Sequence, residues 1–159
     1  LMPQSQAGKV RPARTLLNIR RIEGLDGVRV DGPQLVLGTL VRVTTLLTHP
    51  LVHEHAPLLV LAAEKFASDQ IRNAATVGGN VCNASPAGDL LTPLLALDAE
   101  VELARLSDDG GTLRRRVPIA GLFTGPGRTV REPHELLTAV HVPLARPGQV
   151  VAGRAARVA

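Results

Sequence analysis

The sequence predicts an α+β fold in which antiparallel strands and helices occupy separate stretches of one domain. Three observations carry this prediction: strand-like runs come first, helical patterns follow, and a second set of strands separated by tight turns comes last. The 159 residues are enough to bury a core. A content of 45% hydrophobic and 20% charged residues is typical of a folded globular domain.

The first half of the chain predicts one hairpin and two helices. Two β-rich runs lie within residues 28–40, on either side of the turn-forming Asp31-Gly32-Pro33. A helix is predicted from Val43 to Thr48, ended by Pro50. A second helix is predicted over residues 57–68, because Pro57 suits the first helical position and apolar side chains follow at helical spacing.

The second half predicts a short apolar helix or turn over residues 90–99, followed by antiparallel strands. Residues 99–106 alternate apolar and charged side chains, as a half-buried strand does. The turn sequence SDDGG then leads into TLRRRVPI, which predicts a partner strand and a second hairpin. Gly125-Pro126-Gly127 predicts a loop, and residues 135–144 alternate again and predict a final strand.

Charge and composition argue against several classes of partner. The net charge is +4, but the arginines are scattered, and the run Arg114-Arg115-Arg116 fits an exposed strand face. With only two Phe and no Tyr or Trp, the chain lacks the rings that single-stranded nucleic acid stacks on. The longest apolar run is too short to span a bilayer. We therefore predict no nucleic-acid and no membrane partner, and a cytoplasmic location.

The remaining candidates for chemistry have ordinary explanations. His49, His53 and His55 are interpreted as surface histidines because no carboxylates converge on them, so no metal site is expected. Cys82, the single cysteine, cannot form an internal disulfide and is expected to be a small packed residue. Glu100 and Glu102 share one strand face and are expected to be solvated. No catalytic residue is predicted.

The segment IRNAATVGGNVCNASPAGDL, residues 71–90, is the part least easily explained by packing. Gly78 and Gly79 allow positive φ and a close approach to a ligand, and successive N–H groups in such a turn bind anions. Thr76 and Asn80 offer further polar groups for a phosphate, and Asp89 would accept from sugar hydroxyls. A structural turn and a nucleotide site both explain the segment, whereas a dinucleotide fingerprint and a P-loop do not.

The stretch QIRNAATVGGNVCNASPAGDLLTPLLALDAEVEL closely resembles the FAD-binding subunit or domain of the molybdenum hydroxylases. That family includes the xanthine dehydrogenases and the medium subunit of aerobic carbon monoxide dehydrogenases. The specific motif is T-x-G-G-N followed by S-P-x-x-D-L. The flanks LLNIRRIEGLDGVRVDGPQLVLGTL and TGPGRTVREPHELLTAVHVPL agree with it.

The resemblance implies the p-cresol methylhydroxylase type of FAD-binding fold, mainly its second subdomain, an antiparallel sheet with flanking helices. Residues 1–27 are expected to be a remnant of the first FAD-binding subdomain and a connector. Residues 28–145 correspond to the second subdomain, and 146–159 to a tail that starts the C-terminal subdomain. The family's preceding glycine loop and most of its C-terminal subdomain are expected to be absent, so that the chain is shortened at both ends.

The resemblance also implies a set of cofactor-binding residues. Thr76, Val77, Gly78, Gly79 and Asn80 match the loop that holds the FAD pyrophosphate, and Asp89 matches the acidic residue that contacts the polyol. Ser85, in the second motif, is also expected to bind the cofactor. Phe66 and Leu137 match positions where the family makes apolar contacts to the flavin.

By this resemblance the chain is an electron-transfer component of an oxidoreductase, with FAD as its cofactor. In the family, electrons pass from a molybdenum subunit through 2Fe-2S clusters to FAD, and then to NAD or another acceptor. The expected partners are therefore a molybdenum-cofactor large subunit and a 2Fe-2S small subunit. The alternative is a non-catalytic remnant or assembly module that keeps the fold without binding flavin.

Overall fold

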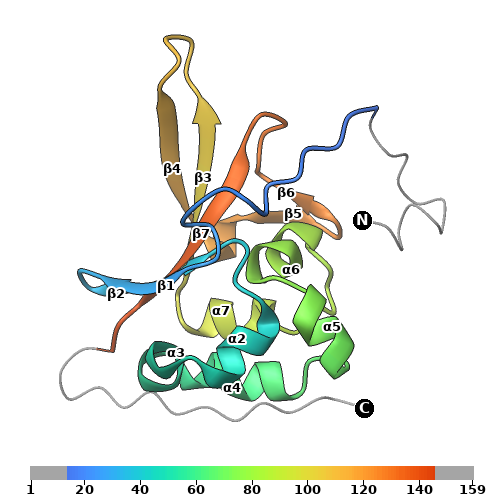
Figure 1. Ribbon diagram of the computed structural model, residues 1–159, viewed down its shortest axis with the longest axis vertical. Helices are drawn as coiled ribbons and strands as arrows, with labels where there is room; N and C mark the ends of the chain where they lie inside the picture. Colours follow the sequence, from blue (N-terminus) through green and yellow to red (C-terminus); the bar gives the residue numbers. More distant parts are fainter. Residues whose placement is uncertain (1–13, 146–159) are drawn as a thin grey trace.

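The computed structural model describes residues 14–145 and contains a five-stranded antiparallel sheet in the order β1-β2-β7-β3-β4. Its strands are β1 (Val28–Asp31), β2 (Gln34–Gly38), β7 (Leu136–Pro143), β3 (Glu100–Leu106) and β4 (Thr112–Pro118). A small second sheet pairs β5 (Phe123–Gly125) with β6 (Arg128–Thr129). The hairpin of β3 and β4 extends well beyond the rest of the sheet (Figure 1).

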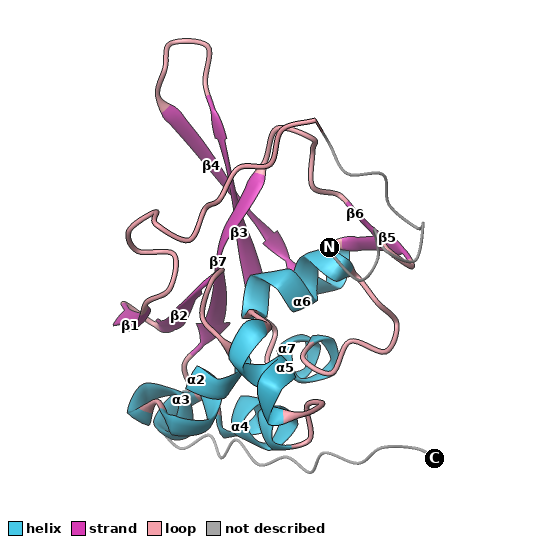
Figure 2. Cartoon of the chain, turned by 45° about the vertical axis from the view of Figure 1, so that its right-hand side comes forward, coloured by secondary structure: helices cyan, strands magenta, loops and turns pink. Residues whose placement is uncertain are grey.

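In the described part of the chain, six short helices gather on one side of the large sheet (Figures 1 and 2). They are α2 (Val43–Thr48), α3 (Pro50–His55), α4 (Pro57–Glu64), α5 (Asp69–Ala74), α6 (Val77–Asn83) and α7 (Leu91–Ala96), and a 3-10 turn, η1 (Ile119–Gly121), follows β4. The core lies between these helices and the sheet. Because strands supply every second residue to it, the cross-strand row Leu37, Val140 and Val101 is fully buried on the helix side.

The opposite face of the sheet is polar but not simply solvated. Glu102 accepts hydrogen bonds from Thr138 Oγ1 at 2.6 Å and from Arg114 Nη1 at 2.5 Å. Burial alone would raise the pKa of Glu102, but these two bonds hold it below its usual value. The expectation that Glu102 is solvated is therefore wrong, because Arg114 of β4 and Thr138 of β7 pair with it.

His141 lies in the middle of this polar face and is almost completely buried. Neither ring nitrogen has a hydrogen-bond partner in the described part of the chain, and Nε2 lies 4.0 Å from Glu102 Oε2. Burial, helped by the positive charge of Arg116, holds the pKa of His141 below its ordinary value. His141 is therefore a buried, neutral side chain, and no motif or pattern in the sequence singled it out.

The α+β prediction and both predicted hairpins are confirmed. The helix boundaries differ in two places. Pro50 does not only end α2, because it is also the first residue of α3. The predicted helix 57–68 ends at Glu64, and Ala67 follows with a left-handed φ of 36°. The division of the chain at residues 27 and 145 stays a prediction, and 1–13 and 146–159 lie outside the described residues.

The largest departure from prediction lies in the segment 71–90, which was interpreted as a structural turn or a nucleotide-binding loop. Most of its first half is helical, in α5 and α6. Ser68 begins α5 with a side-chain cap, and Thr76 begins α6 in the same way. Gly78 and Gly79 therefore sit in the first turn of a helix, and neither has a positive φ. The prediction that these glycines serve a left-handed turn is wrong.

Close packing explains Gly78. A Cβ at this position would overlap Thr39 Oγ1 and lie 2.8 Å from both the Cβ and the backbone oxygen of Thr39. Thr39 is itself buried and follows β2 directly. The missing side chain of Gly78 therefore lets the first turn of α6 lie directly against the chain that leaves β2.

We predict that Gly78→Ala lowers the free energy of unfolding by about 1–3 kcal/mol or more, because the added methyl group overpacks the contact with Thr39. Helix propensity alone would give the opposite sign, a gain of up to about 1 kcal/mol. Urea denaturation measures the difference. Gly121→Ala is the control, since a Cβ there meets nothing within 4 Å. A Gly78→Ala protein as stable as the wild type would refute the packing argument.

Candidate cofactor-binding site

Thr76 fixes the start of α6, the helix that carries the glycine pair. Its backbone is extended, and its Oγ1 accepts a hydrogen bond from the Gly79 N–H at 3.1 Å. This is the usual N-cap arrangement, in which a side-chain oxygen satisfies a helix N–H that has no partner within the helix. The Thr76 hydroxyl keeps its own hydrogen, so it can still donate to a ligand.

Two backbone hydrogen bonds attach the start of α6 to the strand extension. The Val77 N–H donates to Val41 O at 2.9 Å, and the Gly78 N–H donates to Thr39 O at 2.9 Å. An isolated bridge between Arg42 and Thr76 continues the same pairing. The first turn of α6 is thus held as an edge partner of the residues that follow β2.

This attachment changes the expected role of the backbone. We expected successive free N–H groups to form an anion-binding concavity, but those of Val77 and Gly78 already donate to Val41 and Thr39. The next two also have acceptors: Gly79 donates to Thr76 Oγ1, and the Asn80 N–H donates to Thr76 O at 2.9 Å. The expected concavity of free amides is therefore absent between residues 77 and 80, because the fold uses those donors.

Side chains and an open backbone surface remain for a ligand at this point. Gly79 is exposed, and a Cβ there would meet only Thr76 Oγ1, at 2.9 Å. The side-chain oxygen of Asn80 is buried and has no hydrogen-bond partner within residues 14–145. A buried polar atom without a partner is costly in a folded protein. These residues therefore offer a hydroxyl, an unsatisfied amide and a surface without a side chain.

Ser85 and Asp89 lie beyond the other end of α6. The helix has seven residues and a length of about 10 Å, and it ends at Ala84 in a left-handed conformation with a φ of 46°. Ser85 Oγ accepts from the Ala87 N–H at 3.3 Å, and Asp89 is half-buried just before α7. The two predicted polar groups are thus separated from Thr76 by the length of the helix.

Phe66 and Leu137 are part of the hydrophobic core. Their side chains are only 6% and 2% exposed, and both belong to the apolar cluster between the sheet and the helices. The structure therefore brings Thr76, Gly79 and Asn80 together, and it places Phe66 and Leu137 in the core behind them. Their expected contact with the flavin stays a prediction.

Other residues singled out in the sequence differ from expectation in detail. Cys82 is exposed on α6, so the expectation of a packed residue is wrong. His49 is half-buried rather than on the surface, and its Nδ1 has no partner among the described residues. His53 Nε2 lies 2.7 Å from Leu47 O. Within residues 14–145 no three His, Cys, Asp or Glu residues group as metal ligands, and no helix is long and apolar enough to cross a membrane.

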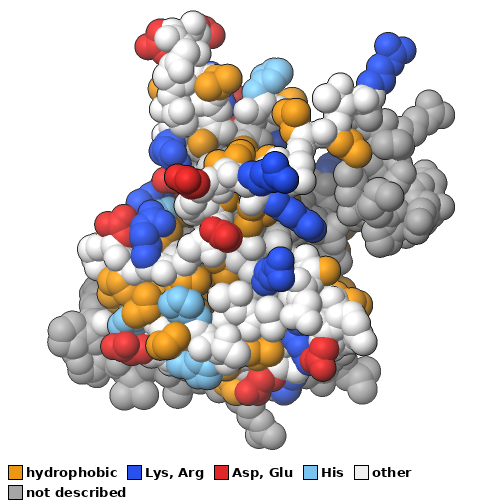
Figure 3. All heavy atoms as spheres, in the orientation of Figure 1, with side chains coloured by type: hydrophobic (Ala, Val, Ile, Leu, Met, Phe, Trp, Pro, Cys, Tyr) orange, Lys and Arg blue, Asp and Glu red, His pale blue; other side chains and the backbone are white. Residues whose placement is uncertain are grey.

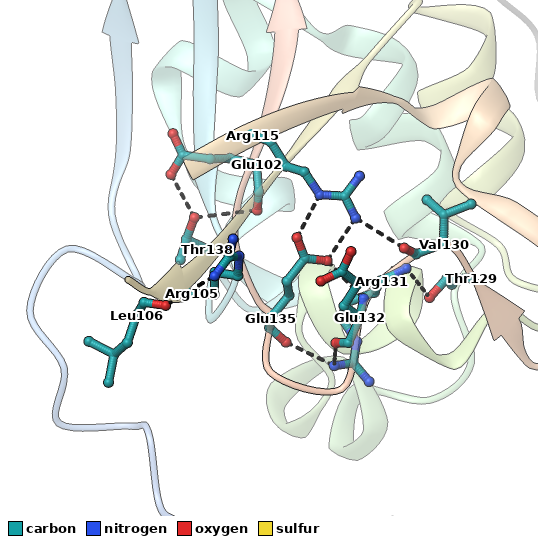
Figure 4. A network of polar contacts seen from close by, with 10 residues as sticks. All are labelled: Glu102, Arg105, Leu106, Arg115, Thr129, Val130, Arg131, Glu132, Glu135 and Thr138. Atoms are coloured by element: carbon teal, nitrogen blue, oxygen red, sulfur yellow. Dashed lines mark hydrogen bonds and ion pairs between the residues drawn. The ribbon is translucent and has the colours of Figure 1, made fainter. Parts of the chain in front are cut away.

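A bidentate ion pair between Arg115 and Glu135 secures the segment that leads into β7 (Figure 4). Arg115 Nε and Nη2 donate to the two Glu135 oxygens at 2.6 and 2.8 Å, and Nη2 also donates to Val130 O at 3.0 Å. The Glu132 N–H donates to Glu135 Oε2 at 2.8 Å. The hydrogen bond from Arg115 lowers the pKa of Glu135 from 4.5 to about 2, against the opposing effect of burial.

Arg131 extends this network, and a separate hydrogen bond reaches the end of α6. Arg131 Nη1 donates to the backbone oxygens of Glu132 and Glu135, which closes the loop before β7. The turn between β5 and β6 is joined to α6 by the Gly127 N–H, which donates to Ala84 O at 2.9 Å. Sequence reasoning treated Arg115 as part of an exposed strand face. Arg115 is exposed, as predicted, but its pairing with the buried Leu103 places it on the helix side of the sheet.

The fold and the glycine-bearing helix start define an α+β cofactor-binding domain. Residues 1–145 match the family described as the FAD binding domain in molybdopterin dehydrogenase, and the chain belongs to this family. FAD is the cofactor of this family.

The chain is 38% identical over 132 residues to a xanthine dehydrogenase FAD-binding subunit of Escherichia coli O157:H7, covering 82% of this chain and 43% of that one. It is 32% identical over 143 residues to a carbon monoxide dehydrogenase medium chain of Hydrogenophaga pseudoflava, covering 90% and 48%.

Solved structures agree with this assignment. A carbon monoxide dehydrogenase structure from Hydrogenophaga pseudoflava superimposes with a TM-score of 0.83 at 31% identity, over 92% of this chain and 49% of that one. Quinoline 2-oxidoreductase from Pseudomonas putida 86 has the same fold, with a TM-score of 0.81 at 24% identity over 90% and 48%. The chain spans about half the length of these relatives.

We predict that Glu135→Gln lowers the free energy of unfolding by about 1–3 kcal/mol at pH 7. This loss is smaller than for a fully buried ion pair, because the Arg115 side chain is 43% exposed and solvent screens its charge. The folded-state pKa is depressed, so the ion pair stabilises the protein fully above pH 4.5 and loses its effect as the pH falls toward about 2.

Urea denaturation at pH 7, 4 and 3 measures this difference, which is expected to shrink with the pH. Glu132→Gln removes the same charge from an exposed position in the same loop and is the control. A difference that stays constant across this pH range would contradict the role assigned to the pair.

Proposed function

We propose that this chain is the FAD-binding, electron-transfer part of a molybdenum-containing hydroxylase or dehydrogenase. The family match over residues 1–145 carries the proposal. The buried Asn80 oxygen without a partner supports it, since this atom lies in the T-x-G-G-N motif and next to the exposed Gly79. A buried polar group without a partner needs an explanation, and a polar cofactor bound at the motif would supply one.

The residues around the start of α6 would hold the polar part of the cofactor. The Thr76 hydroxyl donates to a phosphate oxygen, and the Asn80 amide either donates to such an oxygen or accepts from a hydroxyl. Gly79 keeps the surface open so that the cofactor can lie against the helix. At the other end of the helix, Ser85 and Asp89 would bind the polyol, because an ionised carboxylate accepts hydrogen bonds from hydroxyl groups.

Within this proposal Val77 and Gly78 support the site without binding the cofactor through their amides. Their N–H groups hold α6 on the strand extension, which fixes the positions of Thr76 and Asn80. Phe66 and Leu137 would contribute through the apolar core that backs the site. The pair of Arg115 and Glu135 would keep the start of β7, and with it Leu137, in place.

FAD, when bound, supplies the redox chemistry by accepting electrons singly or in pairs. The chain's own part is to bind and orient it. We propose that electrons come from the 2Fe-2S small subunit and the molybdenum-cofactor large subunit of a cytoplasmic complex, and leave for NAD or another acceptor. Membership of the family supports these partners.

A second candidate is an assembly module that keeps the fold without binding flavin. The observation that favours it is the exposure of large apolar side chains in the N-terminal part of the described chain. Leu16, Leu17 and Ile22 are 63%, 85% and 49% exposed. Such side chains would suit a contact with another protein surface.

We predict saturable binding of FAD by the purified chain, and a loss of affinity of at least about tenfold in Gly79→Asp. The added carboxylate would occupy the open surface of α6 and repel a phosphate. Flavin fluorescence titration measures both proteins. Gly121→Asp is the control, because it adds the same charge at an exposed position with open space.

FAD binding that is unchanged in Gly79→Asp would show that the cofactor does not lie against the start of α6. A wild-type chain that shows no saturable binding would favour the assembly module.

A further inference from the structure

A pocket of about 260 Å³ lies where the N-terminal part of the described chain passes the junction of α5 and α6. Its lining comes from three separate stretches of sequence: Arg20, Asp26, Leu40, Arg42, Asn73, Ala74 and Thr76. In Figure 3 several basic side chains gather near the middle of this face, where that N-terminal part crosses toward the helices. Its polar lining residues are mostly hydrogen-bond donors, which is the feature that suggests a ligand.

The two arginines of the pocket are not neutralised by the protein. Within residues 14–145, neither the Arg20 nor the Arg42 guanidinium forms a hydrogen bond or an ion pair. The arginines of β4 differ, since Arg114 pairs with Glu102 and Arg116 with Glu100. Asp26 is the single carboxylate in the lining, so two positive charges against one negative leave the pocket with a net charge of +1.

Two uncharged side chains add further hydrogen-bond donors to the lining of the pocket. The Asn73 amide can donate two hydrogen bonds, and the Thr76 hydroxyl keeps its hydrogen while its oxygen accepts from Gly79. The geometry is held in place, because Arg42 and Thr76 are bridge partners across the attachment of α6. Arg42 and Thr76 are therefore positioned by the same backbone contacts that begin α6, and Asn73 lies near the end of α5.

We infer that this pocket binds a phosphate group. Guanidinium groups bind phosphate oxygens in a planar, two-pronged geometry, and an amide and a hydroxyl can satisfy further oxygens. Drug-sized ligands occupy pockets of about 300–1,000 Å³, so this smaller space suits one phosphate with a small attached group. Because the pocket is open to solvent, the charge attraction is screened and the affinity depends on ionic strength.

The phosphate has two sources with the same chemistry. It belongs either to the flavin dinucleotide, since Thr76 is shared with the proposed cofactor site, or to a separate phosphorylated ligand. None of Arg20, Arg42 and Asn73 is in the set implied by the T-x-G-G-N motif. The inference therefore does not depend on FAD binding, and one experiment distinguishes the two sources.

The test is calorimetric titration of the flavin-free chain with inorganic phosphate at constant ionic strength. We expect binding to the wild type, and a loss of at least about tenfold in Arg20→Gln and in Arg42→Gln, as removal of a charge-assisted hydrogen bond predicts. Arg21→Gln is the matched control, because it removes the same charge at the neighbouring exposed position outside the lining. Absence of phosphate binding, or an equal loss in all three variants, would overturn the inference.

Repeating the titration on protein saturated with FAD identifies the source. Phosphate binding that disappears assigns the pocket to a phosphate of the flavin, and binding that persists assigns it to a separate ligand; both outcomes support the site. A chain that binds phosphate but not FAD keeps the pocket and refutes the proposed cofactor. A chain that binds FAD but not phosphate keeps the proposed cofactor and refutes the phosphate pocket.

Discussion

The attachment of α6 to the chain leaving β2 is the constraint on which the rest of the site depends. Two backbone hydrogen bonds, from Val77 to Val41 and from Gly78 to Thr39, hold the helix start against the strand extension. They form only because Gly78 has no side chain to meet Thr39. This contact sets where Thr76, Gly79 and Asn80 lie, and it brings Arg42 beside Thr76 in the phosphate pocket. The glycine pair thus serves two purposes: Gly78 allows packing, and Gly79 leaves a surface open.

This arrangement divides the work between backbone and side chains. The first amides of α6 stabilise the fold, so ligand binding falls to hydroxyl, amide and guanidinium groups that have hydrogen bonds to spare. The ion pair of Arg115 and Glu135 plays the corresponding role on the other side, by holding the loop before β7. A bidentate ion pair with a buried carboxylate is a strong contact. It stabilises the loop before β7, which has little helix or strand structure.

The sequence predicted the elements whose signals are local. Asp31-Gly32-Pro33 and SDDGG marked both hairpins, and alternation marked the strands that pair across them. It failed for α6, because two adjacent glycines have poor helix propensity, which the cap at Thr76 and the contact with Thr39 override. It also missed the short helix α5, although Ser68 caps it. The motif located the candidate site through its resemblance to a family. It did not reveal that the Val77 and Gly78 amides are used, because their acceptors lie more than 30 residues earlier in the chain. The phosphate pocket was missed for the same reason, since Arg20, Arg42 and Asn73 meet only in three dimensions.

The most direct test of this account is hydrogen–deuterium exchange of individual amides in the chain without flavin, followed by NMR. The account predicts that the Val77 and Gly78 amides exchange slowly, with the protection of the sheet amides, because opening them requires α6 to leave the strand extension. Any further protection on adding FAD should be shared with the other amides of α6, because the ligand stabilises the folded site as a whole. Fast exchange in the flavin-free chain, with protection gained only on binding FAD, would show that these amides bind the cofactor and would contradict the account.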